Sequence, residues 1–232
     1  MASKWYFPKL FIKLANRYFA FKYKKGTKAR EELAHWVGQA LKKEANDHFG
    51  FFYTTEFGLT KDYFNGKCLL DVGCGPSGSL EWADGAEERI GLDPLANEYL
   101  ALGAITHKMR YISAPAEKMP FKDGHFDAVF SFNALDHVDS LDQTVIEIWR
   151  VLKWGGEFFL ITDMNHSPTT TEPTCIPIDF AERMERQFTL LEKSYFSHSM
   201  LRIYDSLKFC RVKLDQPPAN TSCILKARFR KL

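Results

Sequence analysis

Short apolar runs alternate with polar segments of helical or loop character through the middle of the chain. The runs have the length and composition of buried strands, and they cover Cys68–Val72, Arg89–Leu92, Met109–Ile112, Ala128–Phe132 and Glu157–Thr162. Because such alternation is typical of a parallel sheet with helices on both faces, the pattern predicts an α/β fold.

The flanking regions add further predicted elements. They are a helix over Arg30–Phe49 that ends at Gly50, a helix over Leu141–Leu152 ended by Gly155 and Gly156, strands over Thr189–Tyr195 and Ser222–Arg228, and a strand-like segment over Met200–Lys213. Residues 164–178 are rich in proline and threonine and show no periodicity. They predict a long loop after a central strand, a suitable place for substrate selection.

Composition indicates one principal domain. The 232 residues are 45% hydrophobic and 26% charged, as in ordinary globular proteins. We expect an N-terminal basic, aromatic helical arm over residues 1–50 and one α/β domain over residues 51–232. The chain shows neither a bilayer-spanning apolar stretch nor a secretory signal, so a cytoplasmic location is expected. The five scattered cysteines predict neither a disulfide framework nor a zinc site, and no metal is expected.

The N-terminal arm has a strongly asymmetric charge. Nine lysines and arginines precede the first acidic residue, Glu31, and alternate with aromatic residues. Helical spacing places one apolar stripe on this segment, made of Phe7, Leu10, Phe11, Leu14, Tyr18 and Phe21. Four interpretations remain open: a helix packed on the domain with solvated lysines, a helix on an anionic membrane surface around residues 4–30, a nucleic-acid contact, or a lid that steers an anionic substrate. Nucleic acid is disfavoured because the basic run is short.

A glycine-rich loop follows the first predicted strand. Gly73, Gly75 and Gly78 stand at i, i+2 and i+5, which allows a sharp turn and close backbone approach to a ligand. Asp93 follows Gly73 by 20 residues, where an acid could bind ribose hydroxyls. Asp71 would repel a pyrophosphate but suits a ligand with an ammonium or sulfonium group. The loop therefore predicts a nucleoside cofactor other than NAD.

Four segments in order resemble the class I S-adenosylmethionine-dependent methyltransferases, in particular type 11 methyltransferases and bacterial small-molecule and sugar O-methyltransferases. They are Leu69–Gly78, Ala116–Phe121, Phe126–Ser131 and Arg150–Gly156. The resemblance implies S-adenosylmethionine as cofactor. It also implies a Rossmann-like, seven-stranded, mostly parallel sheet with helices on both faces and an N-terminal helical cap.

The resemblance also implies cofactor-binding positions. Asp71 would act on the ammonium end of the cofactor through the loop, and Gly73 and Gly75 would let the backbone approach the cofactor. Asp93 would hold the ribose, and Asn133 would contact the methionine moiety. Pro94 would lie beside the adenine, which Ala116 or Glu117 would recognise. The chain departs from the family at Pro115, where an aspartate is common. Glu117 could equally be a solvated loop carboxylate.

Two residues are candidates for catalysis. His137 follows the fourth strand, where a neutral imidazole could accept a proton from an alcohol. In the sugar O-methyltransferases that this region resembles, such a histidine works with an aspartate after the fifth strand, and Asp163 stands at that site. A packing role for His137 remains the alternative.

The leading hypothesis is an S-adenosylmethionine-dependent methyltransferase that O-methylates a sugar or a similar small polar metabolite. A second hypothesis is methylation of a membrane-associated lipid or quinone-type acceptor, with the N-terminal arm on the bilayer. A third is a protein that binds the cofactor without transferring its methyl group. RNA methylation is a distant fourth.

Overall fold

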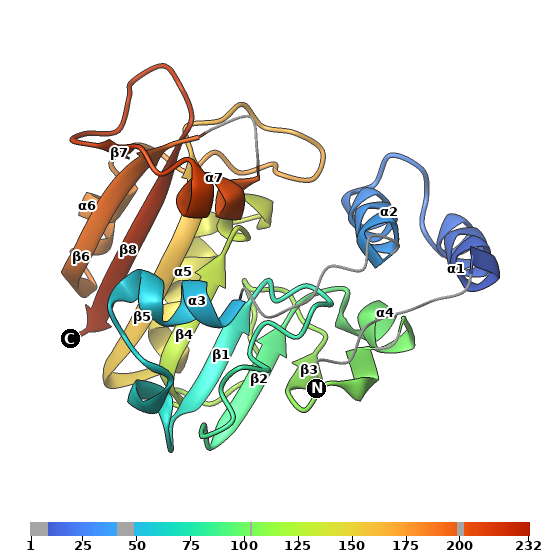
Figure 1. The fold of residues 1–232 in the computed structure, drawn as a ribbon, viewed down its shortest axis with the longest axis horizontal. Helices are drawn as coiled ribbons and strands as arrows, with labels where there is room; N and C mark the ends of the chain where they lie inside the picture. The colour runs from blue at the N-terminus through green and yellow to red at the C-terminus, as the bar shows by residue number, and fades with distance from the viewer. Residues whose placement is uncertain (1–8, 41–48, 103, 199–201) are drawn as a thin grey trace.

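The computed structural model describes residues 9–40, 49–102, 104–198 and 202–232 (Figure 1). Its elements in chain order are α1 (Lys9–Lys22), α2 (Lys28–Ala40), α3 (Phe49–Tyr53), η2 (Thr55–Phe57), η3 (Lys61–Phe64), β1 (Cys68–Val72), β2 (Glu88–Leu92), α4 (Ala96–Ala101), η4 (Ala104–Thr106), β3 (Arg110–Ile112), β4 (Phe126–Phe132), η5 (Leu135–His137), α5 (Leu141–Val151), β5 (Leu152–Met164), α6 (Phe180–Met184), β6 (Phe188–Ser197), α7 (Ile203–Phe209), β7 (Lys213–Leu214) and β8 (Cys223–Lys231).

One sheet organises these elements. Its strand order is β3-β2-β1-β4-β5-β8-β6-β7, in which β1 to β5 run parallel and β8 pairs antiparallel with both β5 and β6. The predicted α/β class and mostly parallel sheet are confirmed. The described strands number eight rather than seven, because the two-residue strand β7 extends the edge beside β6.

Both faces of the sheet are buried. Along β5, Phe159 and Ile161 join a core formed with α2, α3, α4 and α7, while Phe158 and Leu160 join a second core formed with α5 and α6. All four side chains are fully buried, which explains why this strand reads as a continuous apolar run.

The helix predicted over Leu141–Leu152 matches α5 to within one residue, but Gly155 and Gly156 do not end it. Helix α5 ends at Val151, and β5 begins directly at Leu152, so the two glycines lie within the strand. Gly155 has φ of +72°, and a Cβ on Gly156 would lie 2.8 Å from the Lys153 carbonyl oxygen. The glycines therefore shape an irregular start of β5, beside the register shift in its pairing with β4.

The strand-like segment over Met200–Lys213 is mostly helical. Residues 203–209 form α7, with Ile203 and Leu207 buried on the face that packs against the domain. Among the described residues of this segment, from 202 onward, strand structure is confined to its end, where β7 begins. Here the four-residue apolar spacing outweighs the strand propensity of the individual side chains.

The N-terminal arm begins with two helices, α1 and α2, which lie beyond the β3 edge of the sheet, beside α4 (Figure 1). The predicted helix over Arg30–Phe49 matches α2 as far as Ala40; residues 41–48 are outside the described residues, and α3 begins at Phe49. Within the described part of the chain, no helix is long and apolar enough to cross a membrane.

Candidate functional site

The glycine-rich loop leaves the carboxyl end of β1 with a backbone that requires glycine. Gly73, Gly75 and Gly78 have φ of +74°, +57° and +69°. A Cβ on Gly73 would lie 2.3 Å from the Cβ of Ala134, the residue that precedes η5. The predicted turn is thus present, and it brings the ends of β1 and β4 into close contact.

Asp93 connects this loop to the end of β2. Its Oδ2 accepts a hydrogen bond from the Gly75 N–H at 3.2 Å, and its Oδ1 accepts one from the Leu95 N–H at 2.9 Å. Burial raises the pKa of Asp93 to about 6. The carboxylate of Asp93 therefore lies beside the second glycine, while its binding to ribose hydroxyls stays a prediction.

Asp71 lies beneath the loop rather than in it. Its Oδ2 accepts hydrogen bonds from the Tyr53 hydroxyl at 2.9 Å and from the Ser79 hydroxyl. Burial raises the pKa of Asp71 to about 7. The Ser79 hydroxyl ties the end of the loop to β1, and the Tyr53 hydroxyl ties α3 to β1, so an effect of Asp71 on a ligand would be transmitted through the loop. Sequence reasoning missed Tyr53 and Ser79, because neither belongs to a recognisable motif.

The N-terminal arm borders the same loop. The indole of Trp36 on α2 lies 3.0 Å from the position of a Cβ on Gly75, and it packs edge-to-face with Tyr99 of α4. Earlier in the arm, at the end of α1, Lys22 and Tyr23 both bond to the Glu98 carboxylate. The arm is therefore docked on the glycine loop and α4, a contact that the sequence left open among its four interpretations.

The other predicted cofactor positions are spread around this loop. The Pro94 carbonyl accepts a hydrogen bond from Ser113 at 3.0 Å, and Ala116 is buried. The Glu117 carboxylate accepts bonds from the Asp139 and Ser140 N–H groups at 2.7 and 3.1 Å, at the start of α5. Glu117 thus stabilises the N-terminus of α5.

Asn133 closes β4 in a left-handed conformation. Its φ is +55°, and its N–H donates to the Ile161 carbonyl of β5 at 2.7 Å. This turn directs the chain from β4 into η5, which carries His137, so Asn133 lies where the sequence placed it, at the carboxyl end of the central strands.

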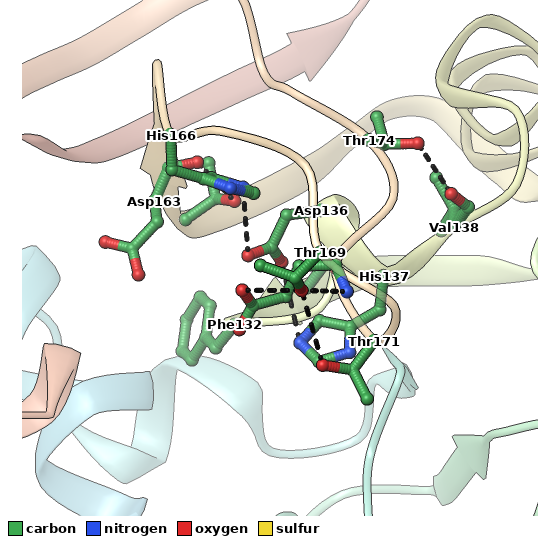
Figure 2. A network of polar contacts seen from close by, with 12 residues as sticks. Phe132, Asp136, His137, Val138, Asp163, His166, Thr169, Thr171 and Thr174 are labelled. Carbon is green, nitrogen blue, oxygen red and sulfur yellow. Dashed lines mark hydrogen bonds and ion pairs between the residues drawn. The ribbon is translucent and has the colours of Figure 1, made fainter. Parts of the chain in front are cut away.

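Titratable side chains gather around His137 at this edge of the sheet, and we call Glu32, Asp136, His137, Asp163 and His166 the polar cluster. Figure 2 shows the last four of them. His137 Nδ1 lies 2.8 Å from the Glu32 carboxylate of α2, and its Nε2 lies 3.9 Å from Asp136 Oδ1. On the other side, His166 Nε2 lies 3.6 Å from Asp136 Oδ2. Asp136 is 1% exposed, and its Oδ1 has no hydrogen-bond partner among the described residues.

Asp163, near the end of β5, belongs to the same neighbourhood. Its Oδ2 pairs with His198 Nε2 at 3.2 Å, while its buried Oδ1 has no hydrogen-bond partner within the described ranges. Its negative charge contributes to the raised pKa of Asp136. The structure thus places both predicted catalytic residues, His137 and Asp163, around Asp136.

Electrostatics in this cluster favour protons on its buried groups. Burial opposes a charged imidazole at His137, but the Glu32 hydrogen bond and the charges of Asp136 and Glu32 outweigh it and raise the pKa. Burial raises the pKa of Asp136 to about 6. The raised pKa values of His137 and Asp136 favour the protonated forms of both side chains.

The loop after β5 encloses the cluster. Thr174 donates from its hydroxyl to the Val138 carbonyl at 2.6 Å and from its N–H to the Asp136 carbonyl at 3.1 Å. These bonds fasten the loop to η5 and place His166 beside the cluster. The sequence predicted this loop, but it did not single out Asp136, His166 or Glu32.

Two groups of side chains among the described residues have the spacing of a metal site. Asp136, His137 and Glu172 offer ligand atoms within 4.8 Å of one another, as do Cys68, Glu88 and His125. The second group is already paired internally and with Arg110. That the chain holds no metal stays a prediction.

Comparison with known proteins gives a consistent result for residues 70–160, which match the family model described as "Methyltransferase domain". The chain is 35% identical over 98 residues to a sterol 4-C-methyltransferase of Caenorhabditis elegans, covering 39% of this chain and 29% of that protein. It is 36% identical over 104 residues to the chloroplastic tocopherol O-methyltransferase of Arabidopsis thaliana, covering 41% and 30%.

A solved S-adenosylmethionine-dependent methyltransferase from Mesorhizobium loti resembles the chain with a TM-score of 0.58 and 16% identity, covering 80% of this chain and 100% of that one. At this identity the likeness concerns the fold. The chain spans less than a third of the length of the two curated relatives, and the region matched by the family model carries the glycine loop, Asp93, Asp136 and His137.

Proposed function

We propose, on the premise that residues 70–160 form a class I methyltransferase domain, that this chain transfers a methyl group from S-adenosylmethionine to a hydroxyl of a small polar metabolite. One observation carries the choice of acceptor. Asp136 and Asp163 each leave a buried carboxylate oxygen without a hydrogen-bond partner among the described residues, at the same edge of the sheet as the glycine loop. Buried acceptor atoms of this kind are costly unless a ligand donates to them.

The residues on the loop suit the cofactor. Gly73 and Gly75 shape the turn at positions where a Cβ would meet Ala134 or Trp36, and Asp93 offers carboxylate oxygens beside Gly75 for the ribose hydroxyls. Asp71 adds negative potential beneath the loop for the ammonium end. When bound, the sulfonium supplies an activated methyl group, so the protein has mainly to orient the acceptor and manage its proton.

His137 and Asp163 are the proposed catalytic pair. A hydrogen bond from His137 Nδ1–H to Glu32 would leave Nε2 as the proton acceptor for a hydroxyl. Asp163 Oδ1 would accept a hydrogen bond from the same acceptor molecule. The sterol and tocopherol methyltransferases among the relatives act on apolar molecules by their names, but the family match does not extend over the loop after β5 that encloses this cluster.

The acceptor class can be tested directly with methyl-labelled S-adenosylmethionine and fractionated cell extract. We expect label in a polar small-molecule fraction, with the product resistant to mild base as an ether. Label in the lipid fraction would contradict the polar acceptor and favour a lipid or quinone acceptor. Tight cofactor binding without any transfer would favour a protein that only binds the cofactor.

Cofactor affinity should fall as the pH drops through the pKa values of the buried acids. Asp93, with a pKa of about 6, binds ribose hydroxyls best when it is ionised, and Asp71, with a pKa of about 7, attracts the ammonium end only when charged. Protonation therefore removes favourable interactions with the cofactor. Titration calorimetry between pH 8 and pH 5 should show the affinity beginning to fall near pH 7 and falling more steeply below pH 6, with proton release on binding.

The variant Asp93→Asn is the matched control. It should bind the cofactor about 1.5–3 kcal/mol more weakly at pH 8, because a charged acceptor is lost. Its affinity should also change less between pH 7 and pH 5. Unchanged affinity at pH 8 would contradict the ribose assignment.

A further inference from the structure

Helix α1 carries an apolar face that the domain does not cover. Leu14, Tyr18 and Phe21 are 57%, 55% and 93% exposed, and their spacing of four and three residues places them on one side of the helix. We call these three residues the α1 stripe. Single exposed apolar residues are ordinary, but three in register on one helix form a continuous surface.

The opposite side of α1 makes the contact with the domain. Phe19 is 3% exposed, and Ala15 and Tyr23 pack against the same core. Lys22 and Tyr23 then fix the end of the helix to Glu98 of α4. The predicted stripe is therefore not the packing face. Of its members, Leu14, Tyr18 and Phe21 have described side chains, and these are exposed to solvent.

The surroundings of the α1 stripe are basic. Lys13, Arg17, Lys24 and Lys25 are exposed near it, and the first acidic residue of the sequence is Glu31. Of the lysines in this region, Lys22 is neutralised by Glu98. An apolar face flanked by exposed basic residues is the composition of a helix that lies in the plane of a membrane interface.

We propose that α1 docks on an anionic lipid bilayer, with the α1 stripe inserted at the level of the headgroups and the flanking basic residues on the lipid phosphates. Charge complementarity selects this occupant. A second copy of the chain would bring like charges together, which opposes self-association. The α1 stripe contains no residue of the glycine loop or the polar cluster, so this proposal stands independently of the acceptor.

Vesicle co-sedimentation of the full-length protein tests the proposal. We expect binding to vesicles of phosphatidylcholine with about a third phosphatidylserine, and much weaker binding to phosphatidylcholine alone. Raising the salt from about 0.05 to 0.5 M should weaken the binding to anionic vesicles, because salt screens the electrostatic attraction between the basic residues and the lipid phosphates. Equal binding to both vesicle types, or to neither, would overturn the proposal.

Substitutions separate the apolar and the basic contributions. The triple variant Leu14→Ser, Tyr18→Ser, Phe21→Ser should lower the partition coefficient about tenfold or more. The double variant Arg17→Gln, Lys24→Gln should lower it roughly fivefold per charge on anionic vesicles only. A matched control is Phe209→Ser with Val212→Ser, which removes two apolar residues that are 69% and 56% exposed elsewhere, and should leave binding unchanged.

Circular dichroism and cofactor binding check that each variant is folded. Two outcomes would contradict the role of the α1 stripe: a triple variant that partitions like the parent, or a control that loses as much. Light scattering that shows a dimer dissociated by the triple variant would assign the surface to self-association instead. Single-stranded RNA that binds in a stripe-dependent way and is displaced by no anionic vesicle would likewise overturn the proposal.

Discussion

Replacing His137 with alanine should lower the rate of methyl transfer by about 100- to 10,000-fold, the usual contribution of a general base. The imidazole is held between Glu32 and Asp136 at the edge of the polar cluster. Cofactor affinity should change little, because Asp93 and the glycine loop are not altered. Single-turnover transfer and calorimetry on the same preparation measure the two effects.

His125→Ala is a matched control for that substitution. His125 also pairs with a carboxylate, Glu88 at 2.6 Å, but it lies outside the polar cluster, at the start of β4. Its removal should leave the rate of methyl transfer within about twofold of the parent protein's rate. If His137→Ala transferred methyl groups as fast as the parent, the histidine would have a packing role only.

Gly73→Ala should destabilise the fold by about 2–4 kcal/mol and abolish detectable cofactor binding. The residue has φ of +74°, which costs a non-glycine residue about 1 kcal/mol. The new Cβ would also lie 2.3 Å from the Ala134 Cβ, which belongs to a short, rigid side chain. Relieving that contact must separate the β1 loop from the start of η5. Denaturant unfolding followed by cofactor titration measures both consequences.

Gly58→Ala distinguishes the two causes. Gly58 has φ of +66°, but a Cβ added there would meet no atom within 4 Å, so it carries the conformational cost without the contact. Its alanine variant should lose only about 1 kcal/mol of stability and keep normal cofactor binding. Equal losses in the two variants would show that the contact with Ala134 contributes nothing.

The sheet and the glycine-rich loop could be predicted from sequence because both depend on local patterns. Strands buried on both faces appear as continuous apolar runs, and glycines with positive φ are needed wherever the turn occurs. The Asp93 carboxylate reaches the Gly75 N–H because the parallel neighbours β1 and β2 end at one edge of the sheet.

Long-range partners could not be predicted in this way. Glu32 contacts His137 across 105 positions, and Tyr53 contacts Asp71 from a helix with no motif. Gly155 and Gly156 were misassigned because glycines normally mark helix ends, whereas here they occur in an irregular strand. The direction of the α1 stripe was open for a related reason: periodicity identifies a face but does not say which face meets the domain.

The hydrogen bond between Glu32 and His137 joins two parts of the chain that fold from separate segments, the N-terminal arm and the sheet domain. The arm is therefore thermodynamically linked to the imidazole. Docking of α2 stabilises the oriented, proton-accepting form of His137 by some free energy. By thermodynamic reciprocity, that form of His137 stabilises the docked position of α2 by the same amount. Arm position and proton affinity at the site are two measures of one equilibrium.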